Sequence, residues 1–192
     1  MVNRIESRRK PGSHSDHRLD LYNQLMGHLE HRKAAPTTVR CYVVTISDTR
    51  TEETDAGGQA IIDLLTEAGH EIRGRRIVRD EPDLVQATVT EQVSSSSVDA
   101  IITTGGTGIS SRDQSYEAIT AFIEKRVDGF GELFRSLSYV EIGPAAMLSR
   151  AFAGTARKKI IISLPGSEHG VRLAMTKLVL PELGHLVREA SR

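Results

Sequence analysis

From residue 39 onward, the hydrophobic positions follow two alternating periodicities. Short runs rich in β-branched residues predict buried strands at residues 39–47, 70–80, 98–104 and 158–164. Apolar residues three and four apart predict helices at residues 57–69, 82–96, 115–127, 130–141, 145–152 and 169–192. In the first of these helices Ile61, Leu64 and Leu65 share one face and Gly69 ends it, whereas Pro181 interrupts the last.

Strands that alternate with helices of about a dozen residues predict an α/β fold. We expect three layers, α/β/α, around a mostly parallel sheet formed by residues 39–192. Ligands of such sheets bind outside the carboxyl ends of the strands, so the loops that follow the strands are the first place to look for a site.

Residues 1–38 differ from this body. The first 40 residues hold 8 of the 25 basic residues, 4 of the 25 acidic ones and four of the seven histidines. Residues 20–32 predict one short amphipathic helix, with Leu21, Leu25 and Leu29 in its stripe, which we expect to pack on an oligomer and to favour a hexamer. Solvated histidines on a partly disordered arm are a better interpretation than a metal site, because no cysteine or tight carboxylate partner accompanies them.

The composition of the chain limits the classes of binding partner that we expect. The formal net charge is zero, aromatic residues make up 4% of the chain and tryptophan is absent. A nucleic-acid partner is therefore not expected, since it favours a basic face and stacking aromatics. Cys41 is the single cysteine, which fits a reducing compartment. No apolar run reaches the roughly 18 residues of a membrane span, so we expect a cytoplasmic protein without a membrane partner.

Small, hydroxyl and carboxylate residues follow four of the predicted strands. Because parallel strands end at one edge of their sheet, we expect these four segments to converge there. The segments are Ser47–Arg50, Arg79–Asp83, Gly105–Asp113 and Leu164–Ser167.

The third segment, GGTGISSRD, suits a phosphate. Glycine permits positive φ and a close approach of backbone N–H groups, and successive N–H groups form a concave anion site. Thr107 adds a hydroxyl and Arg112 adds charge. The segment lacks the lysine of a P-loop and the spacing of a dinucleotide-binding loop, so a plain tight turn stays open as an alternative.

Other structural alternatives stay open as well. Asp113 or Ser115 could cap the helix that begins there, and Asp80 could be held by Arg79 or Arg76. The PGS segment could be a turn that starts a helix, and Ser47 with Asp48 another turn. Asp55, just before Gly57 and Gly58, is expected to cap the first helix.

Two carboxylates facing a phosphate cradle are consistent with Mg²⁺. The ion takes one or two carboxylates and completes its shell with phosphate oxygens and water. Asp80 and Asp113 are the candidate ligands, and bound to the ion they would help to hold a polyphosphate while a phosphoryl or nucleotidyl group moves.

A family resemblance rests on three motifs in order. TTGGTGISSRDQSYEAI, VDGFGELFRSLSYVEIGPAAMLSRAFAG and IIISLPGS resemble the MoaB/Mog family of molybdenum cofactor biosynthesis proteins over about residues 39–185. The resemblance implies a molybdopterin-binding α/β/α domain, a homotrimer or a hexamer, and transfer of AMP from ATP to molybdopterin with Mg²⁺, which releases pyrophosphate.

The resemblance also implies roles for particular residues. Asp80 and Asp113 match the family's two important aspartates, and Ser47 and Asp48 match its first-strand loop. Glu132 is expected near the rim of the site. The implied phosphate-binding residues are Gly105, Gly106, Thr107, Gly108, Arg112, Pro165, Gly166 and Ser167.

Two functional hypotheses follow. The first is a working adenylyltransferase, and the second is a non-catalytic carrier or scaffold that binds molybdopterin or a nucleotide. The resemblance favours the enzyme, because relatives without clear activity tend to depart from aspartate at the position of Asp80, which this sequence keeps. A generic nucleotide-binding Rossmann domain is disfavoured, because its glycine spacing is missing after the first strand.

Overall fold

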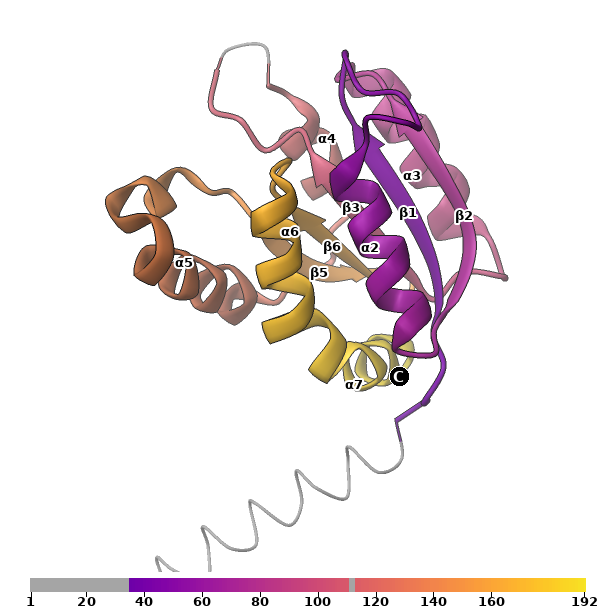
Figure 1. Cartoon of the computed structure of the whole chain (residues 1–192). Helices are drawn as coiled ribbons and strands as arrows, with labels where there is room; N and C mark the ends of the chain where they lie inside the picture. The colour runs from indigo at the N-terminus through magenta and orange to yellow at the C-terminus, as the bar shows by residue number, and fades with distance from the viewer. Residues whose placement is uncertain (1–34, 111–112) are drawn as a thin grey trace, which may run out of the picture. The chain divides into compact units, whose positions relative to one another are not determined.

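Six strands form one sheet in the order β2-β1-β3-β6-β5-β4. The computed structural model describes residues 35–110 and 113–192, and residues 35–192 form one compact unit (Figure 1). The expected arm and its helix at residues 20–32 lie outside the described residues, as does Arg112. The strands are β1 (Arg40–Ile46), β2 (Glu71–Val78), β3 (Ala100–Gly105), β4 (Lys125–Arg126), β5 (Phe152–Ala156) and β6 (Lys159–Leu164).

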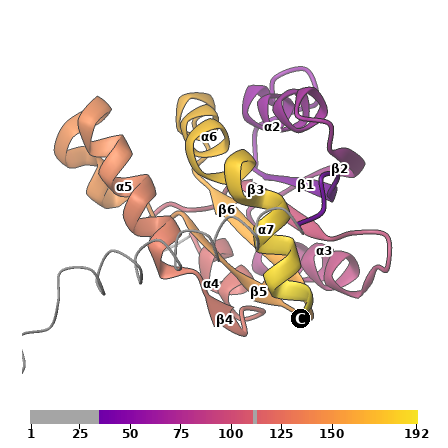
Figure 2. The same ribbon diagram turned by 90° about the horizontal axis from the view of Figure 1, so that it is seen from below.

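Helices cover both faces of the sheet, which confirms the predicted three-layer α/β/α fold (Figures 1 and 2). One face packs against α2, α5, α6 and α7, and the other against α3 and α4. The helical segments are α2 (Ala56–Glu67), α3 (Pro82–Ser94), α4 (Ser115–Thr120), α5 (Asp128–Ile142), the 3₁₀ helix η1 (Gly143–Leu148), α6 (Glu168–Ala174), the π-helical η2 (Met175–Val179) and α7 (Leu180–Ser191).

The inner strand β1 is buried on both faces. Cys41 and Val43 pack with the helices of one layer, whereas Val44 and Ile46 pack with those of the other. Burial on both faces explains why its sequence is a continuous apolar run instead of an alternating one. Strands β2, β1, β3 and β6 are parallel neighbours, so their carboxyl ends lie at one edge of the sheet.

Two predicted helices are wrong in part. The helix expected at 115–127 ends at Thr120, and residues 125–126 form β4 instead. The helix expected at 145–152 is the 3₁₀ helix η1, and Phe152 begins β5, which pairs antiparallel with β4 and β6. Phe152 and Ala153 pack into opposite layers, which is the alternation of a strand and overrides the local helical pattern.

The C-terminal segment is helical, as predicted. Its interruption is the π-helical turn η2, and Pro181 follows as the second residue of α7. Among the described helices, none is both long and apolar enough to cross a membrane.

Candidate active site

The four segments singled out in the sequence meet at the carboxyl edge of the sheet. The N–H of Ser47, after β1, donates to the carbonyl of Val78 at the end of β2 (2.8 Å). The N–H of Asp80 donates to Asp48 Oδ1 (3.1 Å), and the Thr104 hydroxyl donates to the carbonyl of Pro165 (2.8 Å). Loops far apart in sequence are thus tied to one another by direct hydrogen bonds.

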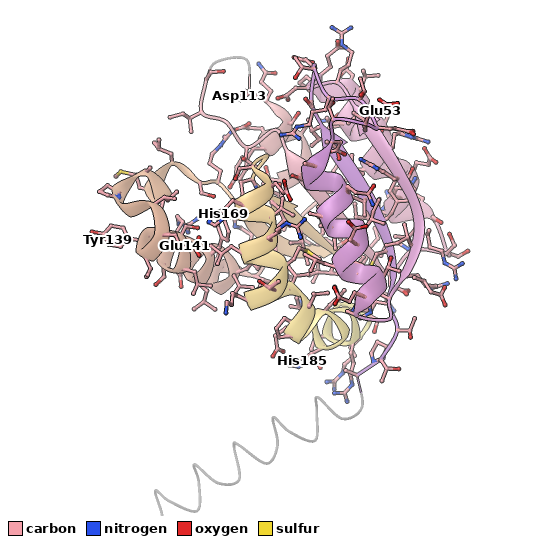
Figure 3. The ribbon with its side chains drawn as sticks, in the orientation of Figure 1. Glu53, Asp113, Tyr139, Glu141, His169 and His185 are labelled. Atoms are coloured by element: carbon pink, nitrogen blue, oxygen red, sulfur yellow. The ribbon has the colours of Figure 1, made fainter. Side chains whose placement is uncertain are left out.

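Three aspartates line one open cleft at this edge. The cleft has a volume of 230 Å³ and is lined by Asp48, Asp80, Ser110 and Asp113. The carboxylate of Asp80 accepts a hydrogen bond from the Ser115 hydroxyl, and Asp113 Oδ2 accepts one from the N–H of Ser110 (2.7 Å). The Asp80 carboxylate is therefore oriented by α4 and the Asp113 carboxylate by its own loop. Asp113 is one of the residues labelled in Figure 3.

The local alternatives for these aspartates are not what the structure shows. Asp113 does not cap α4: its N-cap is Gln114, which makes no capping hydrogen bond through its side chain, and Ser115 is already inside the helix. Asp80 is not held by Arg79 or Arg76 either. The Arg79 side chain lies 3.3 Å from Glu81, and Arg76 pairs with Glu91 at 2.8 Å.

The glycine loop begins with two residues in the left-handed region. Gly105 has φ +89° and Gly106 has φ +63°. A side chain at Gly105 would collide with the carbonyl of Ile46, and one at Gly106 would press on Ser115. Both positions therefore need glycine for conformational and steric reasons, and the chain turns sharply from the sheet edge toward the aspartate cleft.

Arg150 holds the outer half of this loop. Its pattern in the sequence does not indicate this role, because residues 145–152 were expected to be helical. Its guanidinium donates to the carbonyls of Thr107 (3.2 Å), Gly108 and Asp113 (3.3 Å). It also pairs with Glu117 (2.6 Å) and lies 4.3 Å from the centre of the Tyr116 ring. In a trans peptide the carbonyl and the next N–H point in opposite directions, so Arg150 turns the loop's N–H groups of residues 108 and 109 away from itself.

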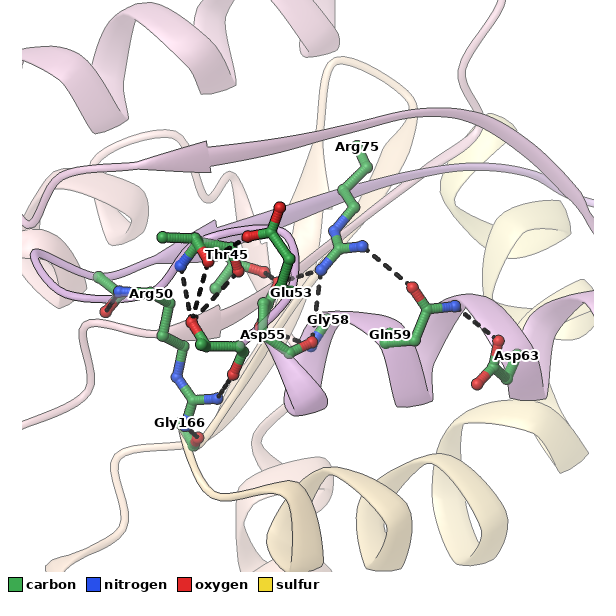
Figure 4. A network of polar contacts seen from close by, with 12 residues as sticks. Thr45, Arg50, Glu53, Asp55, Gly58, Gln59, Asp63, Arg75 and Gly166 are labelled. Atoms are coloured by element: carbon green, nitrogen blue, oxygen red, sulfur yellow. Dashed lines mark hydrogen bonds and ion pairs between the residues drawn. The ribbon is translucent and has the colours of Figure 1, made fainter.

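A buried network stabilises the loop after β1 (Figure 4). Asp55 is 1% exposed, and its carboxylate accepts hydrogen bonds from the Thr45 hydroxyl (2.5 Å), the Arg75 guanidinium (2.7 Å) and the N–H of Gly58 (2.9 Å). Asp55 is the N-cap of α2, as predicted. Burial by itself raises the pKa of Asp55, but the bonds from Thr45, Arg75 and Gly58 outweigh it and hold that pKa below its usual value.

Arg50 links the loop after β1 to the PGS segment. Its guanidinium donates to the carbonyl of Thr54 (3.1 Å) and to that of Gly166 (3.2 Å), and both Arg50 and Gly166 are labelled in Figure 4. In the PGS segment, Ser167 caps α6 by accepting from the N–H of Gly170 (3.2 Å). The predicted helix-starting turn is therefore present, and the proton of the Ser167 hydroxyl can still be donated to a ligand.

One expected site residue stands apart. Glu132 is exposed on α5, and α5 contributes no side chain to the aspartate cleft. Within the described residues, no three histidine, cysteine, aspartate or glutamate side chains come together as a ready-made metal site. The cleft thus offers oxygen ligands from separate loops instead of a closed protein cage.

Comparisons with known proteins converge on one group. Residues 42–185 match the family model described as a probable molybdopterin binding domain. The chain is 53% identical over 164 residues to molybdenum cofactor biosynthesis protein B of Bacillus cereus, covering 85% of this chain and 97% of the relative. Among solved structures, it is similar to a molybdenum cofactor biosynthesis protein B (53% identity, TM-score 0.78, covering 81% of this chain and 98% of that one). It is also similar to the tungsten cofactor synthesizing protein MoaB of Pyrococcus furiosus (36% identity, TM-score 0.73, covering 82% and 100%).

Proposed function

The chain belongs to the MoaB/Mog family of molybdenum cofactor biosynthesis proteins, and we propose that it transfers AMP from ATP to molybdopterin in that pathway. The products would be adenylyl-molybdopterin and pyrophosphate. The observation that carries the proposal is the cleft in which Asp48, Asp80 and Asp113 converge beside a glycine loop. That combination suits two phosphate-bearing reactants and a cation.

The reaction needs positioning more than covalent help. An oxygen of the molybdopterin phosphate attacks the α-phosphorus of ATP, and the bond from that phosphorus to the oxygen bridging to the β-phosphorus breaks, so pyrophosphate leaves. The glycine loop and the Ser167 hydroxyl would donate hydrogen bonds to phosphate oxygens and hold both reactants in line. Arg150 and the Asp55 network would keep these loops in place without contacting a substrate.

The carboxylates fit Mg²⁺. The cleft presents oxygen donors, and Mg²⁺ commonly uses one or two carboxylates together with substrate phosphates, so a closed cluster of protein ligands is not required. Asp80 and Asp113 would hold the ion, with Asp48 at the edge of the same cleft. Bound there, Mg²⁺ would neutralise charge that develops on the phosphate oxygens.

We also propose that the protein assembles as a homotrimer or hexamer. Large apolar side chains are exposed along α5 and η1, which is unusual for a surface that faces water. They are Leu133, Tyr139, Val140, Ile142, Met147 and Leu148, and Val140 is 84% exposed. A second copy of the chain is the occupant that the family resemblance implies for such a surface.

Product formation tests the proposed reaction. Purified full-length protein would be incubated with molybdopterin, ATP and Mg²⁺, and adenylyl-molybdopterin would be quantified by chromatography. We expect turnover in the wild type and a loss of at least about 100-fold in Asp80→Asn and Asp113→Asn, because each removes a charge that holds the ion. The matched control is Asp63→Asn, an exposed carboxylate on α2 that should leave turnover unchanged.

The non-catalytic alternative has a distinct outcome in the same experiment. A carrier or scaffold would bind molybdopterin tightly and form no adenylyl-molybdopterin at any Mg²⁺ concentration. Binding of molybdopterin, measured in parallel, therefore separates an inactive binder from a misfolded preparation.

A further inference from the structure

Ser115, the first residue of α4, is fully buried and bonds to a different loop of the sheet edge. Its exposed fraction is 0%, and its hydroxyl donates to Asp80 Oδ1, in the loop after β2. A serine at a helix start usually caps the helix or bonds to nearby backbone, but the N-cap of α4 is Gln114. The Ser115 hydroxyl is instead committed to a carboxylate 35 residues away in the sequence.

The glycine loop packs against Ser115 as well. A side chain at Gly106 would place its Cβ 2.7 Å from the Cβ of Ser115, so the bare backbone of Gly106 lies directly on this serine. Ser115 is therefore held between the glycine loop and Asp80. Because the residue is buried, water cannot readily take the place of its hydrogen bond to the carboxylate.

The same hydrogen bond connects the two proposed cation ligands. Asp113 precedes Ser115 by two residues, and its Oδ2 accepts from the N–H of Ser110 (2.7 Å). Among the described residues, the Ser115 hydroxyl makes the one side-chain hydrogen bond between residues 79–81 and residues 105–120. Mg²⁺ demands nearly ideal octahedral geometry, so carboxylates from two loops can serve it only when both are held in place.

We propose that Ser115 is a positioning residue for the cation: its hydroxyl fixes Oδ1 of Asp80, leaves Oδ2 available to the ion, and holds Asp80 at a set distance from Asp113. The inference rests on the proposed function for the choice of ion. Ser115 itself contacts neither the ion nor a substrate. Hydrogen-bonding partners of metal ligands orient those ligands, and their loss typically weakens metal affinity or activity by about 10- to 100-fold.

Mn²⁺ alone is the probe, because it is paramagnetic and takes the same oxygen ligands as Mg²⁺. It would be titrated into full-length protein without ATP, and the free ion would be measured by electron paramagnetic resonance. Four of the seven histidines lie in the first 40 residues and could also bind Mn²⁺. Asp80→Asn therefore defines the part of the binding that belongs to the aspartate cleft.

Three serine variants carry the test. Ser115→Ala should weaken binding in the cleft by about tenfold or more, because Asp80 loses the bond that orients it. Ser115→Thr keeps the hydroxyl and should bind Mn²⁺ within about threefold of the wild type. The matched control is Ser163→Ala on β6. Ser163 is also 0% exposed, but its hydroxyl has no partner among the described residues, so the affinity should stay within about twofold.

A purely structural role for Ser115 would give a different pattern. Ser115→Ala would then lower Tm and leave the Mn²⁺ affinity of the folded protein unchanged, which would overturn the inference. Mn²⁺ affinity that Asp80→Asn leaves unchanged would overturn it too, because the ion would then lie elsewhere. A Ser115→Thr variant that has the wild-type Tm but binds as weakly as Ser115→Ala would show that the hydroxyl is not what matters.

The outcome also separates this inference from the proposed function. Binding in the cleft that Ser115→Ala weakens and Ser115→Thr restores supports the inference even if no AMP is transferred. Wild-type turnover, combined with equal Mn²⁺ affinity in the wild type and Ser115→Ala, would overturn the inference and leave the proposed function intact.

Discussion

Replacement of Arg150 by lysine should reduce catalysis far more than stability. Arg150 joins three carbonyls of the glycine loop, at residues 107, 108 and 113, with a planar fork of N–H donors. A lysine ammonium keeps the charge and can keep the pair with Glu117, but one nitrogen cannot reach all three carbonyls at once. The loop that carries Asp113 would then lose the contacts that close it.

The magnitude follows from these contacts. Hydrogen bonds from a charged donor contribute about 1.5–3 kcal/mol each when buried. The Arg150 side chain is 23% exposed, so water replaces part of what is lost. We expect a loss of about 2 kcal/mol in the free energy of unfolding, which corresponds to a Tm decrease of about 4–8 °C for a chain of this size. A displacement of the loop by about 1 Å should lower kcat by about 100-fold.

The assay compares kcat, the Mg²⁺ concentration for half-maximal rate, and Tm. Arg126→Lys is the matched control, because Arg126 also contacts Tyr116 (3.3 Å) and pairs with a carboxylate, Asp128, but touches no part of the glycine loop. We expect Arg150→Lys to raise the Mg²⁺ requirement as well, since Asp113 is a proposed ligand. The reasoning is refuted if Arg150→Lys keeps kcat within twofold, or if Arg126→Lys loses as much activity.

Three further predictions concern stability and assembly. Gly105→Ala should lower the free energy of unfolding in urea by at least about 2 kcal/mol, because the added methyl group would collide with the Ile46 carbonyl. Gly69→Ala should lower it by only about 1 kcal/mol, because Gly69 has a similar φ of +81° but open space around it; equal losses would show that the collision does not matter. Asp55→Asn should destabilise by about 3 kcal/mol at pH 7. The pKa of Asp55 is lowered in the folded state, so the stability that its carboxylate contributes is present above the unfolded pKa of about 3.9 and is lost as pH falls through the folded pKa. The difference in unfolding free energy between wild type and Asp55→Asn should therefore be smaller at pH 3 than at pH 7, and an unchanged difference would contradict this argument. Val140→Lys should reduce the oligomer mass measured by light scattering, and an unchanged mass would exclude that surface from the interface.

The sequence was sufficient to predict the parallel part of the fold. Strands β1, β3 and β6 are buried over almost their whole length because helices cover both of their faces, and each therefore contains an apolar run that can be recognised in the sequence. The convergence of the loops follows from parallel pairing alone, so the sequence is enough to place Asp80, Asp113 and the PGS segment at one edge of the sheet.

The antiparallel strands could not be recognised in the same way. The strand β5 has the sequence FAGTA, whose small residues give little β signal. The turn from β5 to β6 has Arg157 and Lys158 at φ +47° and +64°, where hairpins usually show asparagine and glycine. The role of Arg150 could not be predicted either. Its contacts with the glycine loop arise from tertiary packing between segments more than 30 residues apart.

The central claim is that this edge of the sheet transfers AMP, and the fate of the α-phosphate of ATP tests it most directly. Full-length protein would receive ATP labelled at the α-phosphorus, with Mg²⁺ and molybdopterin, and the label would be followed by chromatography. We predict that the label appears in adenylyl-molybdopterin with one equivalent of unlabelled pyrophosphate, and that Asp80→Asn and Asp113→Asn abolish both. Label that stays in ATP, while the wild type retains tight binding of molybdopterin, would contradict the account.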